Sequence, residues 1–285
     1  MDTYVRVRIY GVSRRKFHKA VEQIKHIASF VEEKLNYHSP ESALSLLNMK
    51  GESSDTFIFD SVAKAQEVAA MTGGAYDPTV ASVEELWDFR NGRVPPESAI
   101  KERLRFVGFG KVKLCGSKVI LPENFKLDLG GIAKGIFLDL AYSVFLKNSL
   151  SGVVEAGGEI LLCGSPFKGR RPWRVAIKNP RGDGFVKVIE LKDGFTWFVA
   201  TSGDYERFFI KNGVRYHHVL NPKTGEPATY AASATVVATS GYLADALATA
   251  MMVSPLEKFD MDLLKKVVFE AYIYREGFGL KRVLP

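Results

Sequence analysis

Residues 234–253 read ATVVATSGYLADALATAMMV and carry most of the information about the fold class. The short apolar run at 234–238 predicts a buried strand, because such runs rich in β-branched residues and ending at polar residues are typical of strands. The longer stretch at 241–253 predicts a helix. Outward from it, the sequence predicts further strands at 152–156, 173–177, 197–201 and 267–274.

The second half of the chain therefore holds a cluster of strands that one long helix interrupts. Strands without regular alternation with helices favour an α+β fold over a doubly wound α/β sheet. Near the start, Val5, Val7 and Ile9 alternate with arginines and predict another strand, while apolar steps of three and four residues over 17–35 predict an amphipathic helix. We predict an α+β fold with mixed or antiparallel sheets and packed helices.

Two more helices are expected in the first half of the chain. One begins at a cap, Asp60 or Ser61, and runs to the glycine pair at 73–74, and the other follows the glycine pair at 130–131. Between these two helices we expect a surface loop and then short strands near 112–128. No internal repeat or low-complexity linker is found, so we expect a single unit over residues 1–285.

The composition is that of an ordinary globular protein, with 285 residues of which 46% are hydrophobic and 25% charged. The formal charge of +7 is spread along the chain apart from short clusters at 13–16 and 168–171. Such clusters are usually solvated faces, so nucleic acid is not an expected partner. A generally positive field would attract a phosphate-bearing ligand or an acidic partner.

Cysteine usage and hydropathy exclude other classes. Cys115 and Cys163 are far apart without a zinc-type spacing, so neither a zinc site nor a disulfide framework is indicated. No apolar run approaches the roughly 20 residues that cross a bilayer, and the first residues lack a signal-peptide core. We expect no membrane span and a chain that is soluble as given, with the compartment unknown: cytoplasmic or, if a leader was removed, periplasmic or anchored by lipid.

The first candidate site is the turn at 127–135, LDLGGIAKG, between a predicted strand and a helix. Glycines let the backbone approach a ligand, and the free N–H groups of a helix start suit phosphate. Lys134, one turn into the helix, adds a positive charge. A tight turn with a solvated lysine is the alternative, since the pattern is neither a Walker A loop nor the dinucleotide-binding G-x-G-x-x-G.

Asp245 and Thr249 form the second candidate, within the predicted helix at 241–253. Residues four apart share a helix face, so the carboxylate and the hydroxyl project together. Both offer oxygen, the ligand that a hard cation such as Mg²⁺ prefers. The alternative is a carboxylate that the helix dipole favours and a threonine bonded to its own backbone.

The third candidate is the pair His217 and His218, just before a predicted turn at 222–225. A histidine with a pKa near neutral is the usual acceptor of a proton from a hydroxyl nucleophile. Histidines are also often structural, and only one of two adjacent histidines is expected to face a site.

Aromatic residues make the fourth candidate. Trp87 and Phe89 follow the segment GAYDPTV at 74–80, and aromatic rings beside a turn can hold a flat ligand by stacking. Core packing explains them at least as well. The turn at 200–205 contains Ser202, which resembles a nucleophile only superficially because Gly-x-Ser-x-Gly is absent.

Taken in order, these segments resemble the ApbE family of FAD:protein FMN transferases over most of the chain. No single motif is decisive, but the ordered set is specific. It comprises MDT at 1–3, Tyr37 ahead of SALSLLN at 42–48, AYDPT at 75–79, DLGGIAKG at 128–135, EAGG at 155–158, TSGDY at 201–205, HVLNP at 218–222 with Thr224 and Gly225, and Asp245 with Thr249.

The resemblance implies a T-fold-like ApbE architecture and a Mg²⁺-dependent reaction. FMN would pass from FAD to a threonine hydroxyl of an acceptor protein, with AMP released. The acceptor would be a flavin-carrying electron-transport subunit with an Asp-Gly-x-Ser/Thr-Gly-Ala-Thr segment.

The resemblance also implies site residues. Contacts to FAD are implied for Met1, Tyr37, Ala75, Tyr76, Asp77, Asp128, Lys134 and the backbone near Leu220. Mg²⁺ would be held by Asp245, Thr249 and the main-chain carbonyl of Gly131, and His218 matches the base.

The chain departs from the family pattern at several points. Asn221 stands where members often have Asp, and the lost charge could retune metal or flavin binding. Ala248 replaces a second acidic residue that some members have, which favours one metal ion over two. Members that act outside the cytoplasm carry a leader, which this sequence lacks.

Three other functions remain open from the sequence. With water in place of threonine, the same residues would hydrolyse FAD to FMN and AMP. A flavin-binding protein without turnover would need the pocket but not the base. A nucleic-acid binder would need aromatic residues interleaved with a basic face, and the sequence shows none.

Overall fold

The computed structural model describes residues 3–166 and 171–284. The α-helices are α1 Arg14–Leu35, α2 Ala43–Lys50, α3 Thr56–Met71, α4 Ala81–Glu84, α5 Glu97–Arg103, α6 Gly130–Lys147, α7 Gly241–Val253 and α8 Met261–Val267, and the 3₁₀ helices are η1 Pro78–Val80, η2 Leu104–Phe106, η3 Phe109–Lys111 and η4 Leu256–Lys258. The strands are β1 Val5–Tyr10, β2 Glu52–Ser53, β3 Lys113–Cys115, β4 Lys118–Ile120, β5 Ser151–Ala156, β6 Glu159–Gly164, β7 Trp173–Lys178, β8 Phe185–Leu191, β9 Phe195–Gly203, β10 Phe208–Lys211, β11 Val214–His217, β12 Ser233–Ala238, β13 Val268–Arg275 and β14 Gly279–Leu284.

A seven-stranded sheet with the order β1-β5-β6-β9-β12-β13-β14 forms the centre of the molecule. All of its neighbouring strands pair antiparallel, with β1 from the start of the chain at one edge and β14 from the end at the other. The smaller sheets are β2-β4-β3, β7-β8 and β10-β11. The predicted α+β class with antiparallel sheets is confirmed.

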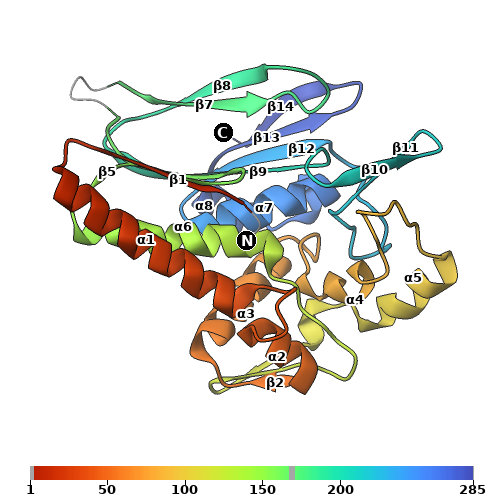
Figure 1. Cartoon of the computed structure of the whole chain (residues 1–285). Helices are drawn as coiled ribbons and strands as arrows, with labels where there is room; N and C mark the ends of the chain where they lie inside the picture. Colours follow the sequence, from red (N-terminus) through yellow and green to blue (C-terminus); the bar gives the residue numbers. More distant parts are fainter. Residues whose placement is uncertain (1–2, 167–170, 285) are drawn as a thin grey trace.

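The two faces of the large sheet have different covers (Figure 1). Helices α1, α6 and α7 pack on one face, where α6 and α7 contact β6, β9 and β12. The β7–β8 hairpin covers the other face, and its Trp173, Ile177 and Leu191 pack on Leu162 and Val199 of the sheet. The candidate residues discussed below come from the helical side and its loops.

The predicted start of the helix at 60 or 61 is wrong, because α3 begins at Thr56. The cap is Asp55, whose Oδ1 accepts the N–H groups of Phe57 and Ile58 at 2.9 and 3.0 Å. A carboxylate that accepts two otherwise free N–H groups stabilises a helix start. Asp60 lies one turn inside the helix, where no free N–H group is left for it to cap.

Helices α6 and α7 cross at a contact between two glycines. A Cβ built on Gly135 would lie 2.2 Å from the Gly241 carbonyl oxygen, so no side chain fits there. Asp139, one turn further along α6, accepts the N–H of Gly241 at 2.6 Å and that of Tyr242 at 3.1 Å. The α6 helix therefore provides the cap of α7, since Ser240 makes no side-chain cap bond.

Candidate functional site

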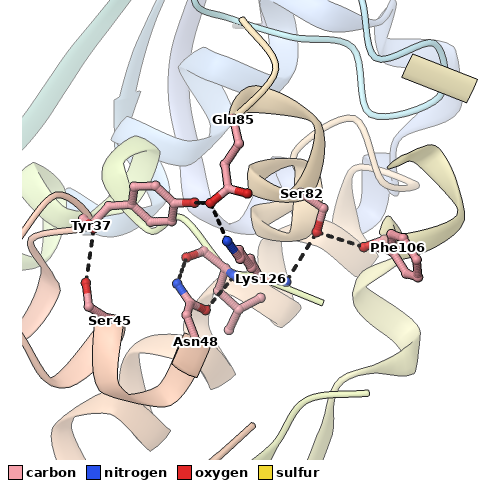
Figure 2. Close-up of polar contacts among 8 residues, drawn as sticks. Tyr37, Ser45, Asn48, Ser82, Glu85, Phe106 and Lys126 are labelled. Atoms are coloured by element: carbon pink, nitrogen blue, oxygen red, sulfur yellow. Dashed lines mark hydrogen bonds and ion pairs between the residues drawn. The ribbon is translucent and has the colours of Figure 1, made fainter. Parts of the chain in front are cut away.

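The segment that leads into the glycine turn is held by distant parts of the chain (Figure 2). The Asn48 side chain donates to the Leu127 carbonyl and accepts the Leu127 N–H, each at 2.9 Å, as a neighbouring strand would. The Lys126 N–H donates to Ser82 Oγ at 3.2 Å. These bonds fix the backbone immediately before Asp128.

Tyr37, a predicted flavin contact, lies beside the same segment. Its hydroxyl donates to Glu85 Oε1 at 2.8 Å, and the Lys126 ammonium pairs with that oxygen (Figure 2). Burial and then the hydrogen bond to Glu85 raise the pKa of the Tyr37 phenol, and the charge of Asp128 adds to the shift. Tyr37 is therefore a neutral donor at the entrance to the glycine turn.

Asp128 begins the glycine turn. Its N–H donates to the Pro78 carbonyl at 2.9 Å, and its Oδ1 accepts the Gly130 N–H at 2.8 Å. Glu84, which no motif in the sequence singled out, lies near this carboxylate. Burial and then the charge of Asp128 raise the pKa of Glu84, against the opposing charge of Arg207. These surroundings favour the neutral form of the Glu84 carboxyl.

The structure brings Gly131, Asp245 and Thr249 together. Asp245 is 1% exposed, and its Oδ2 accepts the Gly135 N–H at 2.9 Å. In a regular helix the Gly135 N–H donates to the Gly131 carbonyl. Asp245 also accepts from this N–H, so the Gly131 carbonyl is not its sole acceptor. A Cβ built on Gly131 would lie 3.6 Å from Thr249 Oγ1 and 3.2 Å from the Tyr76 ring. The glycine turn and α7 thus bring these three residues close together.

Lys134 lies between two buried carboxylates. Its Nζ is 3.4 Å from Glu159 Oε1 and 3.8 Å from Asp245 Oδ1. Burial alone would lower the pKa of the Lys134 ammonium, but the charges of Asp245 and Glu159 raise it above its ordinary value. The site therefore contains a fixed positive charge at the start of α6.

Glu159 is a second residue that the sequence did not single out. Burial raises its pKa, Lys134 opposes that shift, and the charge of Asp245 adds to it. Its Oε2 is buried and has no hydrogen-bond partner among the residues that the structure describes. The sequence did contain one signal that could have identified Glu159. The residue directly follows the glycines at 157–158, which belong to a segment that carries the family resemblance.

Thr249 has two hydrogen-bonding neighbours. Its hydroxyl donates to the Asp245 carbonyl at 3.3 Å, which is the backbone bond of the alternative interpretation. The same oxygen lies 3.1 Å from Ser202 Oγ at the end of β9, a pair in which either hydroxyl can donate. Ser202 therefore orients Thr249 from the neighbouring strand and does not act as an isolated nucleophile.

The donor set around Asp245 fits Mg²⁺. A carboxylate, a hydroxyl and a main-chain carbonyl are oxygen ligands of the kind that this ion takes. Tyr76 Oη, whose ring lies against Gly131, is buried without a partner in the described part of the chain. No group of three or more His, Cys, Asp and Glu side chains able to hold a metal occurs in 3–166 and 171–284. A cation would thus rely on one or two carboxylates plus neutral oxygens and its substrate.

Asp77 is buried, but its carboxylate is already engaged. Oδ1 accepts the N–H of Thr79 at 2.9 Å and its hydroxyl, and Oδ2 accepts the Phe109 N–H at 3.0 Å. Burial raises the pKa of Asp77, and these hydrogen bonds oppose the shift. Ala75 is a buried apolar residue. A flavin contact from Ala75, or from Asp77 with its engaged carboxylate, would therefore come from main-chain atoms.

A hollow of about 390 Å³ lies beside Asp77. It is lined by Gly74, Asp77, Val107, Gly108, Phe109, Gly110, Lys111, Pro222 and Lys223. Lys134, Asp245 and Thr249 are not among the lining residues. The volume is within the usual range of small-molecule pockets.

The two histidines have different surroundings. His217 Nε2 lies 2.8 Å from the Ala228 carbonyl and therefore donates to it, while its Nδ1 is buried without a partner among the described residues. His218 is only partly buried, and its Nδ1 lies 3.4 Å from the Arg207 carbonyl, which leaves Nε2 for a ligand. Burial and then the charges of Arg207, His217 and Lys134 lower the pKa of His218 to about 3. His218 is neutral at pH 7, as a general base must be.

The aromatic candidate belongs to the core. Trp87 and Phe89 stack on each other with centroids 5.6 Å apart, and Trp87 Nε1 donates to the Gly225 carbonyl at 3.0 Å. Leu220 is buried in the same cluster as Trp87. Packing thus explains these rings, and Leu220 could meet a flavin through its backbone only.

The departures from the family pattern have local explanations. Asn221 Oδ1 accepts the Lys223 N–H at 3.0 Å, and its carbonyl accepts the N–H groups of Thr224 and Gly225 at 3.1 and 2.8 Å. Asn221 therefore supports the turn as an aspartate would. Ala248 is fully buried at 0% exposure and offers no ligand atom.

Met1 lies outside the described residues, but the chain start is close to the site. A Cβ built on Gly157 would lie 3.2 Å from Thr3 Oγ1, 3.4 Å from Glu159 Oε2 and 3.8 Å from Lys134 Cδ. The first described residue therefore lies beside the charged cluster. Among the described helices, none has the length and apolar character needed to cross a bilayer.

The chain is similar to known proteins over most of its length. The chain is 35% identical to the FAD:protein FMN transferase of Treponema pallidum, in a match that covers 90% of this chain and 78% of that protein. The crystal structure of the ApbE protein from Thermotoga maritima superposes with a TM-score of 0.88 at 35% identity and covers 98% of this chain and 93% of that one.

A further solved structure shows the same architecture. The flavin transferase ApbE from Vibrio cholerae gives a TM-score of 0.82 at 27% identity, with 99% of this chain and 94% of that chain covered. The model of the ApbE family matches residues 1–273. The chain belongs to the ApbE family.

Proposed function

We propose that this protein is a Mg²⁺-dependent FAD:protein FMN transferase, which moves FMN from FAD to a threonine hydroxyl of an acceptor protein and releases AMP. The observation that carries the proposal is the convergence of Lys134 with the Asp245 and Thr249 oxygens at the start of α6. A cationic helix start with oxygen ligands suits a diphosphate and its counter-ion. The relatives named FAD:protein FMN transferase supply the substrate class.

The start of α6 would bind the diphosphate of FAD. Its free N–H groups and helix dipole favour a negative ligand. The Lys134 ammonium offsets the repulsion that the Glu159 and Asp245 carboxylates would exert on phosphate. Tyr37 and Asp128, joined through the segment at 126–128, would contact the remainder of the flavin nucleotide.

Asp245, Thr249 and the Gly131 carbonyl would hold the Mg²⁺. When bound, the ion would supply Lewis-acid stabilisation of negative charge on the phosphate oxygens. The hydrogen bond from Gly135 keeps the Asp245 carboxylate beside the glycine turn, and the Ser202 hydroxyl keeps Thr249 oriented. These hydrogen bonds therefore hold the Asp245 and Thr249 side chains in place in the absence of a ligand.

His218 would act as the general base. The acceptor threonine oxygen bonds to the FMN-side phosphorus, and its proton passes to His218 Nε2. The bond from that phosphorus to the bridging oxygen breaks, and AMP leaves with this oxygen. Burial and the charges of Arg207 and Lys134 keep His218 neutral before the reaction, with a free lone pair on Nε2, although the same charges make it a weaker base.

Mass spectrometry tests the proposal. After incubation with FAD, Mg²⁺ and a threonine-bearing peptide, we expect the peptide to gain one FMN in a phosphoester bond and AMP to appear in equal amount. FMN and AMP formed at the same rate without peptide would instead identify an FAD hydrolase. Tight FAD binding with no AMP would identify a flavin-binding protein without turnover, and either result would overturn the proposal.

The acceptor and the domain organisation are proposed on the same basis. The acceptor would be a threonine-bearing subunit of an electron-transport complex, and a single unit over residues 1–285 would carry the activity. The main core cluster, which extends from Ala20 to Leu284, supports treating the chain as one unit.

A further inference from the structure

We infer that the Arg207 guanidinium contacts the FMN-side phosphate of FAD and holds it beside His218. The inference rests on the proposed function and names a further residue of the same site. Arg207 lies between the end of β9 and the start of β10, directly after the segment at 201–205 and Glu206.

Arg207 is the cross-strand neighbour of His218. Strands β10 and β11 pair antiparallel as far as Phe208 and His217. The His218 N–H donates to the Arg207 carbonyl at 3.2 Å, which continues this pairing by one residue. Residues opposite each other in an antiparallel register share a face, and faces alternate along a strand. Arg207 and His218 therefore lie on the same face of the hairpin.

The face that Arg207 and His218 share is the inner face of the hairpin. By the same alternation it carries Phe209 and Tyr216, whose rings stack with centroids 5.1 Å apart. The Tyr216 ring lies 5.9 Å from that of the buried Trp87, centroid to centroid. The inner face is thus directed toward the body of the protein.

The Arg207 guanidinium has no counter-ion in the part of the chain that the structure describes. No carboxylate there lies within 4.0 Å of it, and none of its N–H groups makes a hydrogen bond. Its charge acts on the Glu84 carboxyl from beyond that distance. A guanidinium is a fork of donors that matches the oxygens of a phosphate. The exposed Arg207 is therefore available to a ligand.

Arg207 lies within electrostatic reach of both the proposed base and the start of α6. Burial, and after it the charge of Arg207, lower the pKa of His218, and the Lys134 charge adds to this shift. For Lys134, burial lowers the pKa, the charges of Asp245 and Glu159 raise it, and Arg207 opposes the two carboxylates. Arg207, His218 and Lys134 therefore act on one another, although they come from three different segments.

The charge balance at the start of α6 favours such a cation. The Lys134 ammonium is 3.4 Å from Glu159 and 3.8 Å from Asp245, so two carboxylates offset its charge. The charge of Arg207 is not offset in this way, and it repels that of Lys134. A phosphate held between the two cations pairs with the guanidinium and relieves the repulsion.

In the proposed transfer reaction, Arg207 and His218 have separate roles. His218 Nε2 takes the proton of the threonine, while the Arg207 N–H groups donate to non-bridging oxygens of the FMN-side phosphate. No bond to Arg207 forms or breaks. Its charge offsets the negative charge on those oxygens while AMP leaves.

Flavin binding without an acceptor tests the contact. Equilibrium dialysis in the presence of Mg²⁺ compares FAD with riboflavin, which has the same ring system and no phosphate. We expect Arg207→Gln to bind FAD about 10- to 100-fold more weakly than the wild type, as loss of a hydrogen bond to a charged group does. Its affinity for riboflavin should be unchanged, and so should its melting temperature, because the guanidinium has no partner in the described chain.

Lys211→Gln is the matched control, because Lys211 is exposed and lies on the same inner face, opposite Val214. It removes one positive charge from the same hairpin and should leave the affinity for both flavins unchanged. An equal loss of FAD affinity in the two variants would assign the effect to the general positive field and overturn the contact.

Unchanged FAD affinity in Arg207→Gln would overturn the phosphate contact while the wild type still transfers FMN. A raised KM for the acceptor peptide with unchanged FAD affinity would place the guanidinium on the acceptor instead, which also overturns the contact. A wild type that binds FAD but transfers no FMN fails the proposed function, and the binding data still decide the role of Arg207. The two failures are therefore distinguishable.

Discussion

The α6–α7 crossing and the β10–β11 hairpin both adjoin the candidate site, but they are built in opposite ways. At the crossing, Gly135 and Gly241 let two backbones touch, and the carboxylates of the buried Asp245 and the half-buried Asp139 accept hydrogen bonds from the opposite helix. On the hairpin, Phe208 and Ile210 remain exposed although they are apolar. Polar groups with a fixed geometry thus lie where packing is closest, whereas the exposed side chains of the hairpin are held by few neighbours.

The largest effect should come from breaking the crossing. Gly135→Ala places a Cβ 2.2 Å from the Gly241 carbonyl oxygen, so the helices must separate. We expect a loss of about 3 kcal/mol or more in the free energy of unfolding, at the upper end of overpacking effects. Chemical denaturation measures it, and FMN transfer should fall with it.

Gly110→Ala is the stability control, because a Cβ there would meet no atom within 4 Å. If Gly135→Ala unfolds at the same denaturant concentration as Gly110→Ala, the crossing is not as tightly packed as described.

Removal of the proposed base should have the next largest effect. His218→Ala should slow FMN transfer by about 10²–10⁴-fold, the usual contribution of a general base, with FAD binding preserved. Because burial and neighbouring charges lower the pKa of His218 to about 3, its protonation should not reduce the wild-type rate between about pH 8 and pH 5.

The pH profile of kcat is the measurement that checks this assignment. A fall in rate with a midpoint near the ordinary histidine pKa of about 6.5 would contradict the surroundings assigned to His218. An unchanged rate in His218→Ala would remove the residue from the mechanism.

Asp245→Asn tests the role of the negative charge at the α6–α7 crossing and leaves the packing of the crossing unchanged. The amide oxygen can still accept the Gly135 N–H, but the negative charge beside Lys134 is lost. We expect transfer at ordinary Mg²⁺ to fall by about 10²–10³-fold, since charge stabilisation by a metal is worth several kcal/mol. Calorimetric Mg²⁺ titration should show weaker binding at nearly unchanged thermal stability. Retention of both rate and Mg²⁺ affinity would rule out Asp245 as a ligand.

The smallest effect should come from Ser202. Ser202→Ala removes the hydroxyl 3.1 Å from Thr249 Oγ1 and leaves the proposed Mg²⁺ ligands in place. We expect the Mg²⁺ affinity to fall by about tenfold, as for other residues that orient a ligand. Ser202→Thr keeps a hydroxyl and should recover most of the affinity. A Ser202→Ala protein with wild-type Mg²⁺ affinity would show that Thr249 needs no such support.

Local sequence patterns predicted the elements that local forces determine. The alternation at Val5, Val7 and Ile9 gave β1, and the stretch at 241–253 gave α7 with the bounds that the structure has. The hairpin was also within reach, since Asn212-Gly213 between apolar runs is a strong hairpin signal.

Pairings between distant residues explain what the sequence did not reveal. Glu159 lies beside Lys134, and Glu84 lies near Asp128. In each pair the two residues come from segments that are far apart in the chain. No local period encodes such contacts. The helix cap was misplaced for a related reason, since Asp55 and Asp60 are both acceptable caps by type and only the backbone path selects the first.

The double attachment of α7 to α6 limits how the two helices can move relative to each other. The Gly135 N–H holds Asp245, and one turn later Asp139 holds the first N–H groups of α7. Two anchors on the same helix hold the first turns of α7 against α6. Separation of the two helices would therefore have to break both attachments as well as the close contact between Gly135 and Gly241.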